Sequence, residues 1–224
     1  MSKKRGKKNK HTLERILKIS GIILFVFVIY GLLYSTVEKS GTGFGVFGKL
    51  FPTKKVGQLD VTEMYLTKNE YSRPGKKLRR VKGIVVHYTA NPGSSAKNNR
   101  NYFEGLKDTK ETYASSHYVI GLDGEVIQCI PLNEISYASN NRNKDTISIE
   151  CCHPDETGKF NKETYQSLVR LVAWLCGEYN LKKDDIIRHY DVTGKLCPKY
   201  FVDNEDAWHQ FKDDVFAYIE EYSK

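Results

Sequence analysis

Outside its first 18 residues the sequence carries almost no net charge. The formal net charge of the 224-residue chain is +8, but residues 1–18 hold eight basic side chains and one acidic one, and residues 19–37 hold no charge at all. Subtracting the +7 of this tail leaves +1 for the rest. A nucleic-acid-binding domain needs positive charge on its folded surface to displace counterions from phosphates. We therefore expect no nucleic-acid partner.

A disulfide framework is also missing. Five cysteines are present, an odd number that leaves at least one unpaired. Cys129, Cys151, Cys152 and Cys176 lie in apolar stretches without framework-like spacing. We interpret these four as buried free thiols, with disulfides in an exported domain as the alternative.

One long stretch lacks any charged residue. The 19 residues of 19–37 would form a helix of roughly 28 Å, close to the hydrocarbon thickness of a bilayer. The apolar region of a cleaved signal peptide has about 7–15 residues and precedes a small-residue cleavage site. This run is longer and no clear A-x-A pattern follows it, which favours an uncleaved transmembrane signal anchor over cleavage. Because Lys and Arg crowd its N-terminal side, we expect a single-pass cell-membrane protein with a cytoplasmic N-terminus and an extracellular body.

The rest of the chain divides into a linker and one compact domain. Residues 38–58 are rich in Gly, Lys, Ser and Thr and predict a linker. Residues 59–224 contain no repeat or low-complexity segment and alternate strand-like with helix-like pieces. This alternation predicts an α/β fold, a central mixed β-sheet flanked by helices, preceded by the N-terminal transmembrane helix. We expect a monomer.

Local patterns place the elements of this domain. The apolar run at 84–86 predicts a buried strand that ends at His87. Residues 117–130 predict a hairpin with a turn at Asp123-Gly124. In 146–151 two isoleucines face one side of a strand while a serine and a glutamate face the other. Helices are predicted over 95–107, from an N-cap at Asn161, and from about residue 203 or 204.

Three residues of types that ligate zinc stand out. His87 follows a predicted strand, and His189 and Cys197 lie within one loop-like stretch. Two imidazoles and a thiolate fill three positions of a tetrahedral site and leave the fourth open, as in catalytic zinc sites. Water in the open position becomes acidic, with its pKa falling from about 15.7 towards about 7. A lone His after a strand is more often structural, and spacing alone leaves that alternative open.

Four segments resemble the type-2 N-acetylmuramoyl-L-alanine amidase family, in the family's order. They are GIVVHYTA (83–90), SSHYVIGLDGEVIQ (115–128), TISIE (146–150) and RHYDVTGKLCP (188–198). The family includes autolysins, phage endolysins and peptidoglycan recognition proteins. The resemblance covers about residues 80–200. It implies a zinc-dependent hydrolase of the amide between N-acetylmuramic acid and L-alanine, with peptidoglycan as the substrate.

The resemblance also implies roles for single residues. His87, His189 and Cys197 match the three zinc ligands of the family. Glu150, at the end of the I-x-I-E strand, matches a catalytic acid that would move the proton from water to the leaving nitrogen. Lys195 matches a lysine thought to stabilise the tetrahedral intermediate. Considered singly, the glutamate is more readily a strand-edge carboxylate and the lysine a solvated loop charge.

Other candidates concern substrate contacts and support of the metal. We predict substrate binding by His117, Asn141 and Arg142, with core hydrogen bonding or a plain polar loop as the alternatives; the neighbouring Asn140 and Asn143 belong to the same loop. Asp191 could support His189, since a ligating imidazole usually donates its other N–H to an oxygen. Family members often carry a Trp-His pair where this chain has Ser136-Tyr137.

Two other functions compete with the amidase interpretation. Proteins of the same fold bind peptidoglycan without cutting it, but those members typically lack the Cys ligand. A thiol hydrolase with Cys197 as nucleophile and His189 as base is the second alternative. It predicts activity that survives chelation.

Overall fold

The computed structural model describes residues 52–223, which form one compact unit. Among these residues no helix is long and apolar enough to cross a bilayer. The predicted anchor at 19–37 lies outside the described residues. The predicted linker extended to residue 58, whereas Val56 is already buried in the core. Thr53 donates hydrogen bonds to Asn180 and Leu181, so the packed domain begins earlier than expected.

Six strands form one mixed sheet, as the sequence predicts. Its order is β1-β4-β3-β5-β2-β6, with β3 and β4 antiparallel and all other neighbours parallel. The strands are β1 (Thr62–Glu63), β2 (Gly83–Tyr88), β3 (Tyr118–Ile120), β4 (Val126–Gln128), β5 (Thr146–Cys151) and β6 (Ile186–Arg188). The helices are α3 (Ala96–Thr109), α4 (Lys162–Tyr179), α5 (His189–Thr193), α6 (Lys199–Asp203) and α7 (Glu205–Tyr222), with short 3₁₀ turns η1 (Asn140–Arg142) and η2 (Lys183–Asp185).

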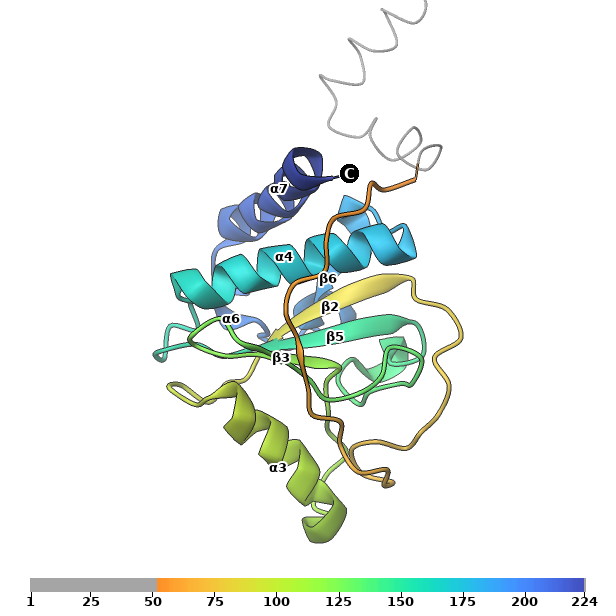
Figure 1. Ribbon diagram of the computed structural model, residues 1–224. Helices are drawn as coiled ribbons and strands as arrows, with labels where there is room; N and C mark the ends of the chain where they lie inside the picture. The colour runs from red at the N-terminus through yellow and green to blue at the C-terminus, as the bar shows by residue number, and fades with distance from the viewer. Residues whose placement is uncertain (1–51, 224) are drawn as a thin grey trace, which may run out of the picture. The chain divides into compact units, whose positions relative to one another are not determined.

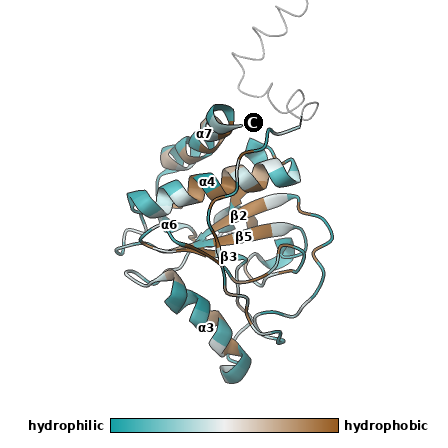
Figure 2. Ribbon diagram, in the orientation of Figure 1, coloured by the Kyte–Doolittle hydropathy of each residue, from teal (hydrophilic) through white to brown (hydrophobic). Residues whose placement is uncertain are grey.

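Helices cover both faces of the sheet (Figure 1). Helices α4 and α7 pack on one face around the larger core, and α3 packs on the other face around a smaller core that includes Leu106 and Val119. The central strands and the inner side of α4 are the most hydrophobic parts of the ribbon (Figure 2). The two helical layers leave the carboxyl ends of the central parallel strands accessible, and that edge is where α/β sheets place their sites.

The predicted local signals agree with these elements. Asn161 caps α4, with its side-chain oxygen accepting from the Thr164 N–H. The hairpin is β3–β4, and Gly124 in its turn has φ of 80°, a conformation that favours glycine. The five cysteines are all buried and free, as expected for internal thiols.

Candidate active site

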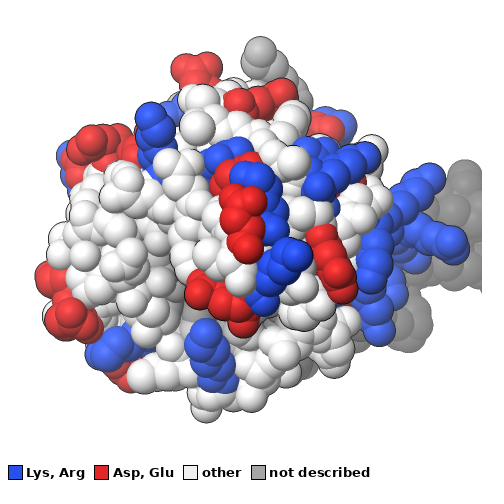
Figure 3. All heavy atoms as spheres, turned by 90° about the horizontal axis from the view of Figure 1, so that it is seen from below, with Lys and Arg blue, Asp and Glu red and all other residues white. Residues whose placement is uncertain are grey.

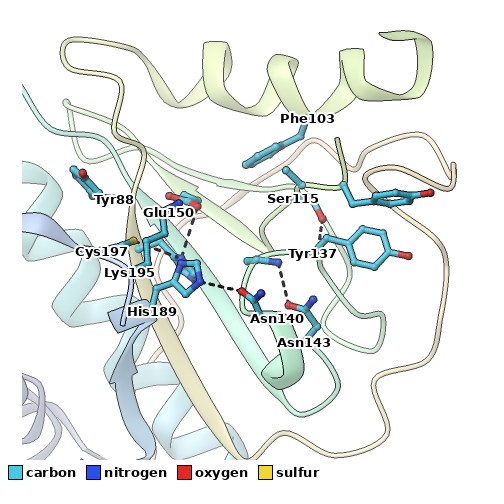
Figure 4. Close-up of a pocket in the computed structure, with 14 residues that line it drawn as sticks. Tyr88, Phe103, Ser115, Tyr137, Asn140, Asn143, Glu150, His189, Lys195 and Cys197 are labelled. Carbon is cyan, nitrogen blue, oxygen red and sulfur yellow. Dashed lines mark hydrogen bonds and ion pairs between the residues drawn. The ribbon is translucent and has the colours of Figure 1, made fainter. Parts of the chain in front are cut away.

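Three neighbouring parallel strands bring the predicted chemical residues to one edge of the sheet. Strand β2 lies between β5 and β6, and His87 pairs in register with Glu150. His189 directly follows β6, so it emerges at the same edge. Cys197 comes from the segment after α5 and reaches the same point, as the close-up in Figure 4 shows.

The two histidines and the cysteine form a compact group of possible metal ligands. One ligand atom from each of His87, His189 and Cys197 lies within 4.8 Å of the others. The Sγ of Cys197 is 3.8 Å from Nδ1 of His87, and the two imidazole ring centres are 4.7 Å apart. All three side chains are buried. No other group of three metal-ligating side chains is found in the described domain.

Burial sets the protonation of these groups. Desolvation holds the pKa of His87 well below 6.5 and also lowers that of His189, with a further contribution from the charge of Lys195. Both imidazoles are therefore neutral at pH 7 and can offer a lone pair to a cation. Burial, with a smaller contribution from Glu150, raises the pKa of the Cys197 thiol to about 12. Without a cation beside it, this cysteine is a protonated thiol and a poor nucleophile.

One short loop supports both imidazoles. Ser139 Oγ lies 3.2 Å from Nε2 of His87, and Asn140 Oδ1 lies 3.2 Å from Nε2 of His189. The Asn143 side chain fixes the loop by accepting hydrogen bonds from the backbone N–H groups of Ala138 and Ser139. These outer contacts orient ligand rings, and Ser139 is a residue that the sequence analysis missed.

Asp191 does not support His189 as predicted. Its carboxylate instead accepts from the backbone N–H and the guanidinium of Arg188, the residue before the ligand. Arg188 also donates to Glu205 and to the Phe201 carbonyl. The aspartate therefore ties the start of α5 to the C-terminal helices and acts on His189 only through the backbone.

Glu150 stands beside the ligand group with an unusual environment. Its Oε1 lies 4.0 Å from Nδ1 of His87, while its Oε2 is buried without a hydrogen-bond partner among the described residues. Burial raises the pKa of this carboxyl from 4.5 to about 8, and the charge of Lys195 opposes the shift. A carboxyl with a pKa near neutrality can both take up and release a proton at working pH.

The ligand group opens into a pocket of about 360 Å³. Lys195, which is exposed, and Glu150 line it beside the three candidate metal ligands. Aromatic and amide side chains line the rest (Figure 4). These are Tyr88, Phe103, Tyr113, Tyr137, Asn140 and Asn143. Tyr137, which replaces an expected histidine, packs edge-on against Tyr113 with ring centres 5.7 Å apart.

The structure does not place two of the predicted substrate-binding residues at the pocket. His117 is fully buried, with Nδ1 accepting from the Ser148 N–H and Nε2 donating to the Glu134 carbonyl. Its role is a core hydrogen-bonding one. Arg142 is held by a 2.8 Å ion pair with Asp145 and does not line the pocket.

Asn141, the third predicted substrate-binding residue, is exposed on η1 and is absent from the pocket wall. Its neighbours Asn140 and Asn143 line the pocket instead. The structure thus places other side chains of this loop, rather than residues 141 and 142, at the pocket wall. Substrate binding by Asn141 stays a prediction.

Comparison with known proteins gives one consistent family. Residues 77–200 match the family described as N-acetylmuramoyl-L-alanine amidase. The chain is 39% identical over 168 residues to the N-acetylmuramoyl-L-alanine amidase CwlL of Bacillus licheniformis, covering 69% of this chain and 46% of that protein. It is 37% identical over 177 residues to the N-acetylmuramoyl-L-alanine amidase BlyA of Bacillus subtilis strain 168, covering 70% and 47%. This chain thus spans about half the length of these relatives.

The fold is also similar to a solved structure. That of PlyL superposes with a TM-score of 0.61 at 25% identity, over 70% of this chain and 97% of that one. Nearly the whole of that structure is therefore represented in the described domain.

Proposed function

The chain belongs to the N-acetylmuramoyl-L-alanine amidase family, and we propose that it is a zinc-dependent member that hydrolyses the amide between N-acetylmuramic acid and L-alanine of peptidoglycan. The observation that carries this proposal is the buried group of two neutral imidazoles and one cysteine beside a partnerless carboxyl oxygen. A buried polar atom without a hydrogen-bond partner destabilises the fold. A contribution to stability therefore does not explain this group of side chains.

Zinc fits the residues present. From zinc–ligand bonds of about 2.0–2.3 Å, ligand atoms in a tetrahedral site lie roughly 3.3–3.8 Å apart. The three candidate atoms all lie within 4.8 Å, so small side-chain adjustments suffice. His87, His189 and Cys197 would hold the ion, with Ser139 and Asn140 orienting the rings. Three protein ligands leave one position for water or substrate, which is the arrangement of catalytic zinc sites.

The ion, when bound, supplies Lewis acidity that polarises the scissile carbonyl and makes water more acidic. The residues of the chain do the remaining work. Glu150 takes the proton of the attacking water and delivers it to the nitrogen of the departing L-alanine, a transfer suited to its raised pKa. Lys195 supports the negative charge that develops on the carbonyl oxygen, because its ammonium faces the same pocket.

The walls of the pocket suit a substrate made of sugar and peptide. Aromatic rings such as Tyr113 and Tyr137 offer flat apolar surfaces with polar tips. The amides of Asn140 and Asn143 offer donors and acceptors for peptide groups. We assign the stem peptide to this side of the pocket.

The two alternative functions account for less of the site. A binding module would have no use for a proton-transferring Glu150 beside an intact ligand set. A thiol hydrolase needs an accessible, ionisable cysteine, whereas Cys197 is 1% exposed with a pKa raised to about 12.

We further propose that residues 19–37 anchor the domain to the cell membrane with the amidase domain outside. The length and charge-free composition of this run support the anchor, and the basic residues before it support the orientation. The enzyme would then act on the cell wall next to the membrane.

Digestion of purified peptidoglycan tests the proposed reaction directly. The protein is expected to release stem peptides with a free L-alanine amino terminus while the glycan strands stay intact, as mass spectrometry of the products will show. A matched Cys197→Ala variant should release none. Release of disaccharides, or of peptides cut within the stem, would refute the bond assignment.

A further inference from the structure

A short segment before β2 carries a local excess of positive charge, although the net charge of the domain is close to zero. Within residues 76–82 five of seven side chains are basic. All five are exposed: Lys76, Lys77, Arg79, Arg80 and Lys82. In Figure 1 the loop that leads into β2 lies on the right-hand side of the domain. Figure 3, the view from below, shows Lys and Arg side chains gathered along the same side.

These charges are mostly uncompensated. Lys82 approaches Asp145 at 3.9 Å, but no ion pair involves the other four basic residues within residues 52–223. Arg73, a few residues earlier, shows the contrast, because it forms a 2.8 Å pair with Glu134. The segment thus presents a strongly positive surface on a domain of near-zero net charge, which is the arrangement of a docking site for a polyanion.

The segment is held rigidly against the domain. Leu78 is buried in the larger core, and its N–H donates to the Asn133 carbonyl at 2.8 Å. The Ile135 N–H donates to the Lys76 carbonyl at 2.9 Å. Because the backbone is fixed, the basic side chains need little ordering to meet a partner together.

A hollow of about 670 Å³ lies beside the segment, and the apolar side chains of Leu132 and Tyr179 form part of its wall. Arg79 and Arg80 line it together with the amides of Asn133 and Asn180. The single acidic residue in its wall, Glu178, is paired with Lys55 at 3.0 Å. The two guanidinium groups suit phosphate oxygens.

This hollow lies at the opposite end of the sheet from the active site. The basic segment runs into the start of β2 at Gly83, whereas His87 and the metal-ligand group stand at the end of that strand. At about 3.3 Å per residue, the four residue steps from Gly83 to His87 span roughly 13 Å. A partner bound at the basic segment therefore leaves the catalytic pocket accessible.

The chain also enters the domain at this hollow. The N–H of Thr53 donates to Oδ1 of Asn180 at 2.8 Å, and Asn180 is part of the wall. In sequence only 14 residues, 38–51, separate the predicted anchor from the described domain. A chain of 14 residues spans at most about 50 Å and much less on average. With the anchor proposed at 19–37, this short connection would keep the basic segment near the membrane, where even a weak attraction is effective.

We propose that the basic segment 76–82 and its hollow bind the headgroups of anionic phospholipids, which orients the catalytic pocket away from the membrane and towards the wall. This proposal rests on the proposed anchor at 19–37 but not on the amidase reaction. Anionic lipid attracts clustered Lys and Arg within about a Debye length of the surface. An anionic polymer of the wall is the competing partner, and the tether favours the lipid.

The test uses the full chain in nanodiscs of phosphatidylcholine with or without phosphatidylglycerol. Because the native cysteines are all buried, a fluorophore can be placed at Asn133→Cys beside the hollow, or at Asn101→Cys on α3 as the distant control. Spin-labelled lipid headgroups are expected to quench the label at position 133 only when anionic lipid is present, and the label at position 101 in neither case. High salt should abolish the quenching.

A charge-matched pair of variants separates local from overall charge. Arg79→Glu/Arg80→Glu should lose the anionic-lipid quenching. The control Lys97→Glu/Lys110→Glu, which changes the net charge equally at exposed positions in α3 and directly after it, should retain the quenching. Equal loss in both pairs would overturn the specific surface. If Arg79→Glu/Arg80→Glu instead weakens retention on lipid-free cell walls and leaves the quenching unchanged, the partner is a wall polymer and the proposal is wrong. Failure of the chain to enter nanodiscs would overturn the anchor and this proposal together, while amidase activity, measured separately, would be unaffected.

Discussion

Replacing Glu150 by glutamine should stabilise the metal-free protein while it strongly lowers the activity of the zinc-loaded enzyme. The carboxyl is ionised above about pH 4.5 in the unfolded chain but only above about pH 8 in the folded protein. Between these values the unfolded state releases a proton that the folded state retains, so the free energy of unfolding falls as the pH rises. At about 1.4 kcal/mol per pH unit the cost reaches about 3 kcal/mol at pH 7. This is an upper figure, because 17% of the side chain remains exposed.

A glutamine at position 150 does not lower the free energy of unfolding in this way, because its side chain does not ionise. In urea denaturation of the chelated proteins, wild type and Glu150→Gln should therefore differ by less than about 1 kcal/mol at pH 5 and by about 4 kcal/mol at pH 8, with the variant more stable. Other titrating groups contribute equally to both proteins and cancel in the difference. A difference that is the same at pH 5 and pH 8 would refute the reasoning. In the zinc-loaded enzyme the variant should bind zinc normally but turn over about 10²–10⁴-fold more slowly; loss of zinc would instead identify Glu150 as a ligand.

Three further predictions concern the surroundings of the site. Lys195→Ala should lower kcat by about 10²–10³-fold with zinc content unchanged, measured on soluble muropeptides, because only stabilisation of the developing charge is lost. Ser139→Ala should weaken zinc binding by about 10–100-fold in competition with a chromophoric chelator, since Nε2 of His87 loses its partner; unchanged affinity would show that the contact is incidental. His117 has its pKa lowered from 6.5 to about 4 by burial. As the pH falls from 6.5 to about 4, His117 takes up a proton in the unfolded chain but not in the folded chain, so the free energy of unfolding of the wild type should fall by up to about 3 kcal/mol. Urea titrations at pH 7 and pH 4 should show this loss in the wild type and not in His117→Gln.

The grouping of His87, His189 and Cys197 could be predicted from the sequence because local patterns and the family resemblance coincide. The run of β-branched residues before His87 predicts where that strand ends. The alternation of isoleucines with other residues predicts that Glu150 faces the opposite side of its strand. Neither prediction needs tertiary information. What the sequence could not show is that the two strands are adjacent and in register, since 63 positions separate the two residues. Parallel pairing of distant strands depends on the whole topology.

The differences between the expected and the observed placement of residues also have identifiable causes. Arg142 was expected at the substrate, but Asp145, three residues later, pairs with it, and that spacing was visible in the sequence. His117 was expected near the site, but its partner Ser148 comes from another strand and could not be identified from local pattern. The basic segment 76–82 was overlooked because net charge summed over the whole domain cancels a local excess.

Zinc dependence of amide cleavage tests the central claim most directly. The purified protein should contain one zinc per chain, lose both the metal and the release of stem peptides on treatment with chelator, and recover both on addition of zinc at close to one equivalent. Cleavage at full rate by protein shown to be free of metal would contradict the account, and would require a mechanism in which His87, His189 and Cys197 serve another purpose.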